Sequence, residues 1–191
     1  MPRRLPGPGF TLLELMITLA VAAVLGAVAT PSFTALLDHQ RLQAAARHLQ
    51  ADIALARQEA ARRGQPVTLQ FEPGTAWCYS LGTGQAADCH PDSHQASLAA
   101  SMPLGSQMIK RVQASDYPGI TLLQAGAMVL GPQTGISLGT LTNLSRGQAR
   151  FASRDGQQLQ VRLGPQGRAN VCAPAAPVPG TPACPPDAPG T

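Results

Sequence analysis

The apolar stretch near the N-terminus constrains the fold more than any other feature of the sequence. Residues 10–30 are all apolar or small, apart from threonines and Glu14. A helix of roughly 20 such residues can cross the hydrocarbon core of a bilayer, because each residue adds about 1.5 Å of rise. The short segment before it, residues 1–9, carries two arginines, which are expected to stay on the cytoplasmic side.

A secretory signal peptide is the main alternative, since it also combines a basic start with an apolar run. Three features favour a retained membrane helix instead. The apolar run is longer than that of a signal peptide, it contains the carboxylate of Glu14, and it continues into a helical pattern without a clear small-residue cleavage site. We therefore predict a chain that crosses the membrane once and exports the residues after 30.

The start of the apolar stretch resembles the processing signal of type IV pilins and type II secretion pseudopilins. In that signal a glycine precedes the cleaved bond, a phenylalanine follows it, and a glutamate is the fifth mature residue; Gly9, Phe10 and Glu14 match it. The resemblance implies that a prepilin peptidase/N-methyltransferase cuts between Gly9 and Phe10 and methylates the new amine. Pro31 matches a helix-bending proline of many pilins, and we expect a kink or a loosened turn there.

Glu14 needs an explanation of its own, because a carboxylate inside an apolar membrane helix costs about 3 kcal/mol on insertion scales. We expect Glu14 to pair with the Phe10 α-amino group of a neighbouring subunit during assembly. The alternative is a glutamate near the helix end whose carboxylate reaches the membrane interface. The pairing hypothesis predicts that Glu14 matters for incorporation into a filament more than for folding.

Beyond the apolar stretch, residues 31–64 are expected to continue as an amphipathic helix. Apolar residues recur there at spacings of three and four, which is typical of one buried face. These residues are Leu42, Ala45, Leu49, Ile53, Ala56 and Ala60. We expect this face to pack on a sheet, with a coiled-coil seam as the alternative. His39 and His48 are expected on solvated faces, and the residues placed on other faces of the helix are Arg41, Arg47, Asp52, Arg57 and Arg62. Gly64, followed closely by a proline, ends the helix.

Residues 65–172 are expected to form a β-rich globular domain. Short segments of strand-like pattern between turns predict strands at 67–71, 77–81, 120–123, 128–130, 149–153, 158–163 and 168–172. The clearest turn signal is Asp155-Gly156, since both residues tolerate positive φ. Residues 173–191 are rich in Pro, Ala and Gly, and they predict an irregular extended tail.

The order of these elements is similar to that of the GspH/FimT group of minor pilins and pseudopilins. The shared features are a long helix ending near Gly64, a Trp-containing strand, and a late β-hairpin ending in Gly167-Arg168. The resemblance implies an α+β fold, a pilin-like roll in which the helix packs on a mostly antiparallel sheet, without an active site or cofactor. It also implies that other pilins or pseudopilins bind the N-terminal helix. The C-terminal domain would lie in the periplasm, anchored in the bacterial inner membrane, before assembly into a pilus or pseudopilus.

Four cysteines in an exported chain favour disulfides over free thiols. Of the three possible pairings we favour Cys78 with Cys89 and Cys172 with Cys184; each closes a loop of about ten residues, and the second would hold the C-terminal tail. The run from Cys89 to His94 has side chains that can ligate metals, but its spacing fits no standard zinc pattern. We therefore expect a polar loop there and no metal site.

Positive charge is concentrated towards the C-terminal end. Between residues 145 and 172 five arginines oppose one acid; they are Arg146, Arg150, Arg154, Arg162 and Arg168. Arginines on adjacent strands or turns could form a stripe that contacts DNA phosphates. FimT-like minor pilins resemble this pattern around a C-terminal Gly-Arg motif, although here Asn170 stands where a second arginine would be expected. The alternative is a basic sheet face that is solvated or docks on a neighbouring pilin.

Two classes of function remain open. One is a minor pilin that contributes to type IV pilus assembly, with a minor pseudopilin of type II secretion as its close variant. The other is a filament-borne receptor for double-stranded DNA in natural transformation. Whole-chain charge does not decide, because the 14 basic residues, less two in residues 1–9, barely exceed the 10 acidic ones. A membrane-anchored enzyme is not expected, because no Gly-rich phosphate loop, serine elbow or carboxylate pair stands out.

Overall fold

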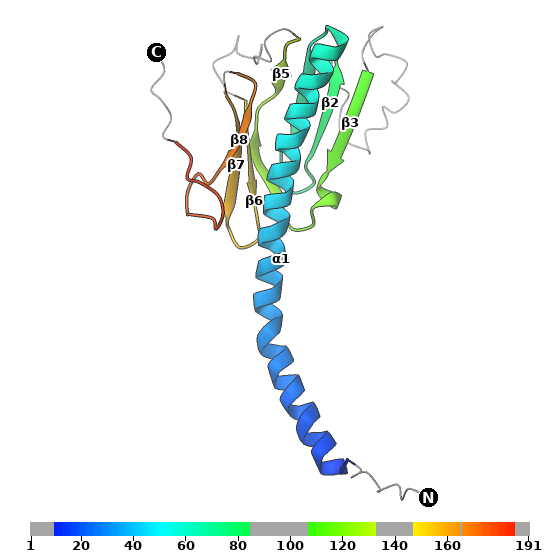
Figure 1. Cartoon of the computed structure of the whole chain (residues 1–191), viewed down its shortest axis with the longest axis vertical. Helices are drawn as coiled ribbons and strands as arrows, with labels where there is room; N and C mark the ends of the chain where they lie inside the picture. The colour runs from blue at the N-terminus through cyan, green and yellow to red at the C-terminus, as the bar shows by residue number, and fades with distance from the viewer. Residues whose placement is uncertain (1–9, 85–106, 133–146, 165, 186–191) are drawn as a thin grey trace, which may run out of the picture. The chain divides into compact units, whose positions relative to one another are not determined.

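The structure is a computed structural model that describes residues 10–84, 107–132, 147–164 and 166–185, without the side chains of residues 28–32. It has the expected α+β class, with one long helix followed by antiparallel strands (Figure 1). Two compact units, Met1–Leu37 and Asp38–Thr191, are described separately below.

The helix α1, Leu12–Arg63, begins at a threonine cap. The backbone N–H of Glu14 donates to Oγ1 of Thr11 at 3.2 Å, which satisfies one of the free donors of the first turn. The helical backbone continues through Pro31, and the bend expected at this residue stays a prediction.

The sequence predicts a membrane span over residues 10–30, and the described helical segments can be judged by their length and apolar character. None of these segments combines the length and the apolar character needed to cross a membrane. The span at residues 10–30 therefore stays a prediction from the sequence.

The second unit contains two antiparallel sheets where one was predicted. The first has the order β3-β2-β1-β5, with β1 at Val67–Glu72, β2 at Cys78–Thr83, β3 at Gln107–Gln113 and β5 at Met128–Leu130. The second has the order β4-β6-β7-β8, with β4 at Thr121–Ala125, β6 at Gln148–Ala152, β7 at Gln158–Leu163 and β8 at Ala169–Cys172. A short 3₁₀ helix, η2, covers Ala114–Asp116.

β3 is the strand that the sequence did not predict. Its sequence places Lys110 and Arg111 in the middle of the strand, which hides the alternation of apolar and polar residues. The pairing with β2 also shifts register between Leu81 and Gly82. Its place in the sheet therefore comes from long-range pairing with β2 and from contacts of its side chains with α1.

The core forms between the C-terminal half of α1 and the two sheets, and the predicted apolar helix face is confirmed. Leu42, Ala45, Leu49, Ile53, Ala56 and Ala60 are each at most 2% exposed. Trp77 joins the two sheets, because it precedes β2 of the first sheet and its indole N–H donates to the Ile120 carbonyl, next to β4 of the second, at 2.8 Å. Its ring also meets Phe151 of β6 edge-on, with 5.3 Å between centroids.

Two glycines end elements where the sequence predicted an end. Gly64, directly after α1, has φ 65°, and Gly156, in the turn between β6 and β7, has φ 79°. This positive φ is accessible to glycine at little steric cost. The Asp155-Gly156 hairpin is therefore confirmed.

The C-terminal segment 173–185 folds back onto the unit and is not an extended tail. Cys172 and Cys184 form a disulfide, which is one of the two favoured pairings. The Ala173 N–H donates to Pro182 at 2.8 Å, and Val178 is only 3% exposed. Burial of Val178 gives this Pro-rich segment an apolar anchor that its composition did not predict. Cys78 is also disulfide-bonded, whereas its favoured partner Cys89 lies outside the described residues.

Candidate functional site

Phe10 and Glu14 lie at the start of α1. Phe10 precedes the helix and is 81% exposed, and the Glu14 side chain is also exposed. The first turn of a helix favours a carboxylate, because its unpaired N–H groups and the helix dipole carry partial positive charge. Gly9 lies outside the described residues. The carboxylate is thus placed where a group from another molecule can reach it.

The apolar side chains of the first unit are exposed around the whole helix. Large apolar side chains that are at least 50% exposed are Phe10, Leu12, Leu13, Leu15, Met16, Ile17, Leu19, Val21, Val24, Leu25, Phe33 and Leu36, whereas Leu37 at the end of the unit is partly buried. A helix that is apolar on all sides needs an apolar surrounding, such as lipid or other helices.

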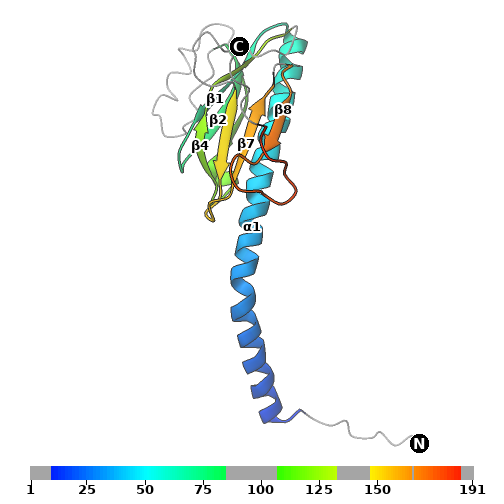
Figure 2. The same cartoon turned by 90° about the vertical axis from the view of Figure 1, so that its left-hand side faces the viewer.

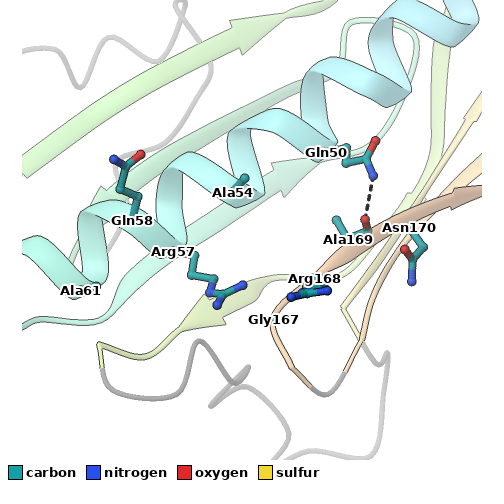
Figure 3. A pocket seen from close by; sticks show the side chains of 9 residues that line it. All are labelled: Gln50, Ala54, Arg57, Gln58, Ala61, Gly167, Arg168, Ala169 and Asn170. Atoms are coloured by element: carbon teal, nitrogen blue, oxygen red, sulfur yellow. Dashed lines mark hydrogen bonds between the residues drawn. The ribbon is translucent and has the colours of Figure 1, made fainter.

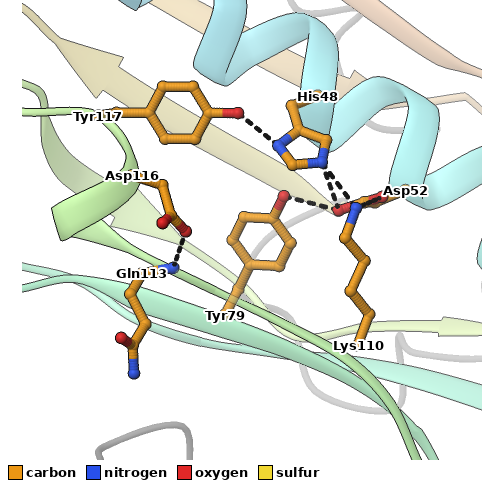
Figure 4. Close-up of polar contacts among 7 residues, drawn as sticks. All are labelled: His48, Asp52, Tyr79, Lys110, Gln113, Asp116 and Tyr117. Atoms are coloured by element: carbon orange, nitrogen blue, oxygen red, sulfur yellow. Dashed lines mark hydrogen bonds and ion pairs between the residues drawn. The ribbon is translucent and has the colours of Figure 1, made fainter.

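A polar cluster joins α1 to the first sheet, and Asp52 is its centre (Figure 4). The Lys110 ammonium donates to Asp52 Oδ1 at 2.6 Å and to His48 Nε2 at 2.6 Å. The Tyr79 hydroxyl donates to Asp52 Oδ2 at 2.8 Å. His48 Nδ1 contacts the Tyr117 hydroxyl. Because Nε2 accepts from Lys110, this geometry assigns the proton of neutral His48 to Nδ1.

Asp52, expected on a face other than the apolar one, is buried, and His48, expected on a solvated face, is partly exposed. Asp52 is only 3% exposed, because it lies beside the apolar face of α1 and β3 brings Lys110 over it. His39 is also partly buried, and its Nδ1 hydrogen-bonds the Gln157 side chain at 2.9 Å. Since β3 was not predicted, the sequence offered no counter-charge that would have marked Asp52 as buried.

Burial and neighbouring acids keep the tyrosines of this cluster protonated. Burial raises the pKa of Tyr79 well above its usual range, and the Asp52 carboxylate raises it further. Burial also raises the pKa of Tyr117, with Asp116 as the next cause. A protonated Tyr79 remains a donor to Asp52 at neutral pH, so the cluster acts as a clamp between α1 and the sheet.

The described arginines of this group are spread over the second sheet. Arg154 follows β6, and its guanidinium packs over Gly119, whereas Arg168 lies in the turn at the opposite end of β7. Arg146 lies outside the described residues. The four described arginines therefore extend from the turn after β6, through β6 and β7, to the turn before β8, and a DNA-binding stripe stays a prediction.

Arg150 and Arg162 share the outer face of the second sheet. In the ladder between β6 and β7, Arg150 pairs with Gln160, and Arg162 lies two residues further along the same face. The Arg162 guanidinium donates to the Pro185 carbonyl at 2.9 Å, so it helps to hold the C-terminal segment.

A pocket of about 480 Å³ lies between α1 and the turn that contains Arg168 (Figure 3). Arg57 of α1 and Arg168 point toward one another across it, and Gln58 and Asn170 add amide groups. The Gln50 side chain donates to the Ala169 carbonyl at 2.8 Å at one end of the pocket. No acid lines this pocket among the described residues. Arg57 was missed in the sequence because only folding brings it beside Arg168.

Across the described ranges, no group of three or more His, Cys, Asp or Glu side chains is arranged to hold a metal ion. The run from Cys89 to His94 lies outside these ranges.

Comparison with known proteins gives two matches. A family model described as type II transport protein GspH matches residues 45–167. A model described as the prokaryotic N-terminal methylation motif matches residues 8–30, which include Gly9, Phe10 and Glu14. No curated protein and no solved structure matches the chain.

Proposed function

Because the chain belongs to the GspH family and is a minor pilin or pseudopilin in general terms, we propose that it is a minor pseudopilin of a type II secretion filament. In this role the N-terminal helix enters the filament, and the globular unit binds neighbouring subunits. No catalytic step is part of the proposal.

The observation that carries the proposal is the helix of the first unit, which is apolar and exposed on all sides. Lipid would cover this surface before assembly, and the helices of other subunits would cover it afterwards. The methylation motif over the same residues supports cleavage before Phe10 by a prepilin peptidase. Cleavage there would create a free α-amino group on Phe10, four residues before Glu14. The charged amine of one subunit could then pair with the Glu14 carboxylate of the next.

The type II assignment follows the description of the matched family as a type II transport protein, whereas a type IV pilus would use the same assembly physics. A DNA receptor is the weaker candidate. It would need arginines that reach phosphates, but Arg162 donates to the Pro185 carbonyl and the guanidinium of Arg154 packs over Gly119.

Deletion of the gene in its source organism tests the assignment. We expect loss of secreted folded proteins from the medium, with surface pili and transformation by added DNA unchanged. Restoration by the intact chain, measured by the amount of exported enzyme in the medium, is the control. Normal secretion together with lost pili or lost transformation would contradict the type II assignment.

A further inference from the structure

We propose that the free edge of β8 and the Arg57–Arg168 pocket form one groove that binds an extended, acidic peptide segment of a neighbouring filament subunit. The source of the peptide rests on the proposed function, whereas the chemistry of the groove does not. Figure 2 shows β8 at the margin of its sheet, beside the C-terminal half of α1.

The edge of β8 has backbone groups that point outward. The Gly164 N–H donates to the Arg168 carbonyl at 2.8 Å, which sets the alternation of the ladder between β7 and β8. Arg162 and Asn170 are therefore a hydrogen-bonded pair, and Val171, the next residue along β8, directs its N–H and C=O away from β7.

Two contacts agree with this alternation. Ala169, two residues before Val171, turns its carbonyl outward to the side chain of Gln50. Ala173, two residues after Val171, bonds outward to Pro182 and Cys184. Between these two contacts, β8 has no further strand neighbour in the described chain. The backbone of Val171 is thus a place where an incoming strand could add to the sheet.

The space along this edge is large enough for a peptide. The Arg57–Arg168 pocket is about 480 Å³, and a second pocket of about 610 Å³ continues past Val171 to Pro182 and Pro185. The two pockets share Gln50 and Asn170, so they lie next to each other along β8.

The positive charge of the two pockets favours a peptide with acidic side chains. Arg57 and Arg168 line the first pocket and Arg162 the second, and neither pocket has an acidic residue in its described lining. No ion pair joins Arg57 or Arg168 to an acid within the described ranges. A peptide with acidic side chains at alternate positions would satisfy both the strand edge and the pair Arg57 and Arg168, since alternate side chains of a strand share one face. DNA would use the arginines but not the outward groups of Val171.

Fluorescence anisotropy of the full chain in detergent tests the groove. The probe is a labelled peptide of about eight residues that alternates glutamate and threonine. We expect Arg57→Glu combined with Arg168→Glu to weaken binding about tenfold or more. The matched control is Arg47→Glu, an exposed arginine on the same helix that lines neither pocket, which should change binding less than about twofold.

The strand pairing is tested separately. Val171→Pro removes an outward N–H without removing a donor of the β7–β8 ladder, and we expect about tenfold weaker peptide binding. A peptide N-methylated at alternate residues tests the same point on the unchanged protein and should bind about tenfold more weakly. Equal binding of the methylated and unmethylated peptides would overturn strand addition. Tighter binding of a double-stranded oligonucleotide at the same salt, lost in the double arginine variant, would replace the peptide by nucleic acid.

The source of the peptide is tested in cells. We expect the double arginine variant to be recovered in the released filament fraction at a level well below that of Arg47→Glu. Normal recovery of a variant that no longer binds the peptide would exclude a neighbouring subunit as the source. A wrong filament function would give a different pair of results. The purified chain would still bind the peptide, but replacing Glu14 would not change recovery of the chain in filaments.

Discussion

Replacing Glu14 by alanine is expected to lower recovery of the chain in released filaments at least about tenfold. The carboxylate is exposed in the first turn of α1. In an apolar helical bundle, its loss would leave the Phe10 amine of the adjacent subunit charged and unpaired, which is strongly unfavourable. The measurement is the ratio of the chain in filaments to the chain in the membrane fraction.

Two further variants define the cause of the Glu14 effect. Glu14→Asp keeps the charge and should retain more assembly than Glu14→Gln, which keeps the shape and hydrogen bonding. Thr18→Ala, in the same helix, removes a hydroxyl that donates to the Leu15 carbonyl at 2.9 Å, and it should assemble normally. If Glu14→Ala is recovered in filaments at the level of the unchanged chain, the pairing hypothesis is wrong.

Replacing Asp52 by alanine is expected to lower the free energy of unfolding of the globular unit by about 3 kcal/mol. Asp52 accepts from the buried Tyr79 hydroxyl at 2.8 Å and from Lys110 at 2.6 Å. Without the carboxylate, the Tyr79 hydroxyl loses its partner inside the core, while Lys110 is partly exposed and can regain water. The effect should therefore come mainly from the tyrosine and from the lost packing.

Urea unfolding of the full chain in detergent, followed by the fluorescence of Trp77, measures this change. Trp77 is the single tryptophan and lies in the core beside Tyr79, so its emission reports on this unit. Glu59→Ala is the matched control, because it removes a carboxylate of the same helix whose partners, Arg62 and Arg63, keep their access to water. We expect the control to cost less than about 1 kcal/mol. A similar small cost for Asp52→Ala would show that the clamp contributes little to stability.

Local patterns predicted the parts of the fold that depend on neighbouring residues. The apolar face of α1 from Leu42 to Ala60, the end of the helix at Gly64 and the hairpin at Asp155-Gly156 all follow from spacing and turn chemistry. The division into two sheets did not follow, because it depends on which distant strands pair. β3 was missed for the same reason, and with it the burial of Asp52 under Lys110.

The candidate sites show the same contrast. The residues for processing and assembly, Gly9, Phe10 and Glu14, are close together in the sequence and could be recognised there. The pocket depends on Arg57 and Arg168, which are far apart in the chain and meet only when α1 packs beside β8. Arg154 and Arg168, which are closer in the chain, lie at opposite ends of β7.

The covalent state of the N-terminus in the assembled protein is the most direct test of the account. Mass spectrometry of the chain purified from its source is expected to find a mature protein that begins at Phe10 and carries a methyl group on the α-nitrogen. A chain that functions with residues 1–9 still attached, or one that begins at another residue, would contradict it.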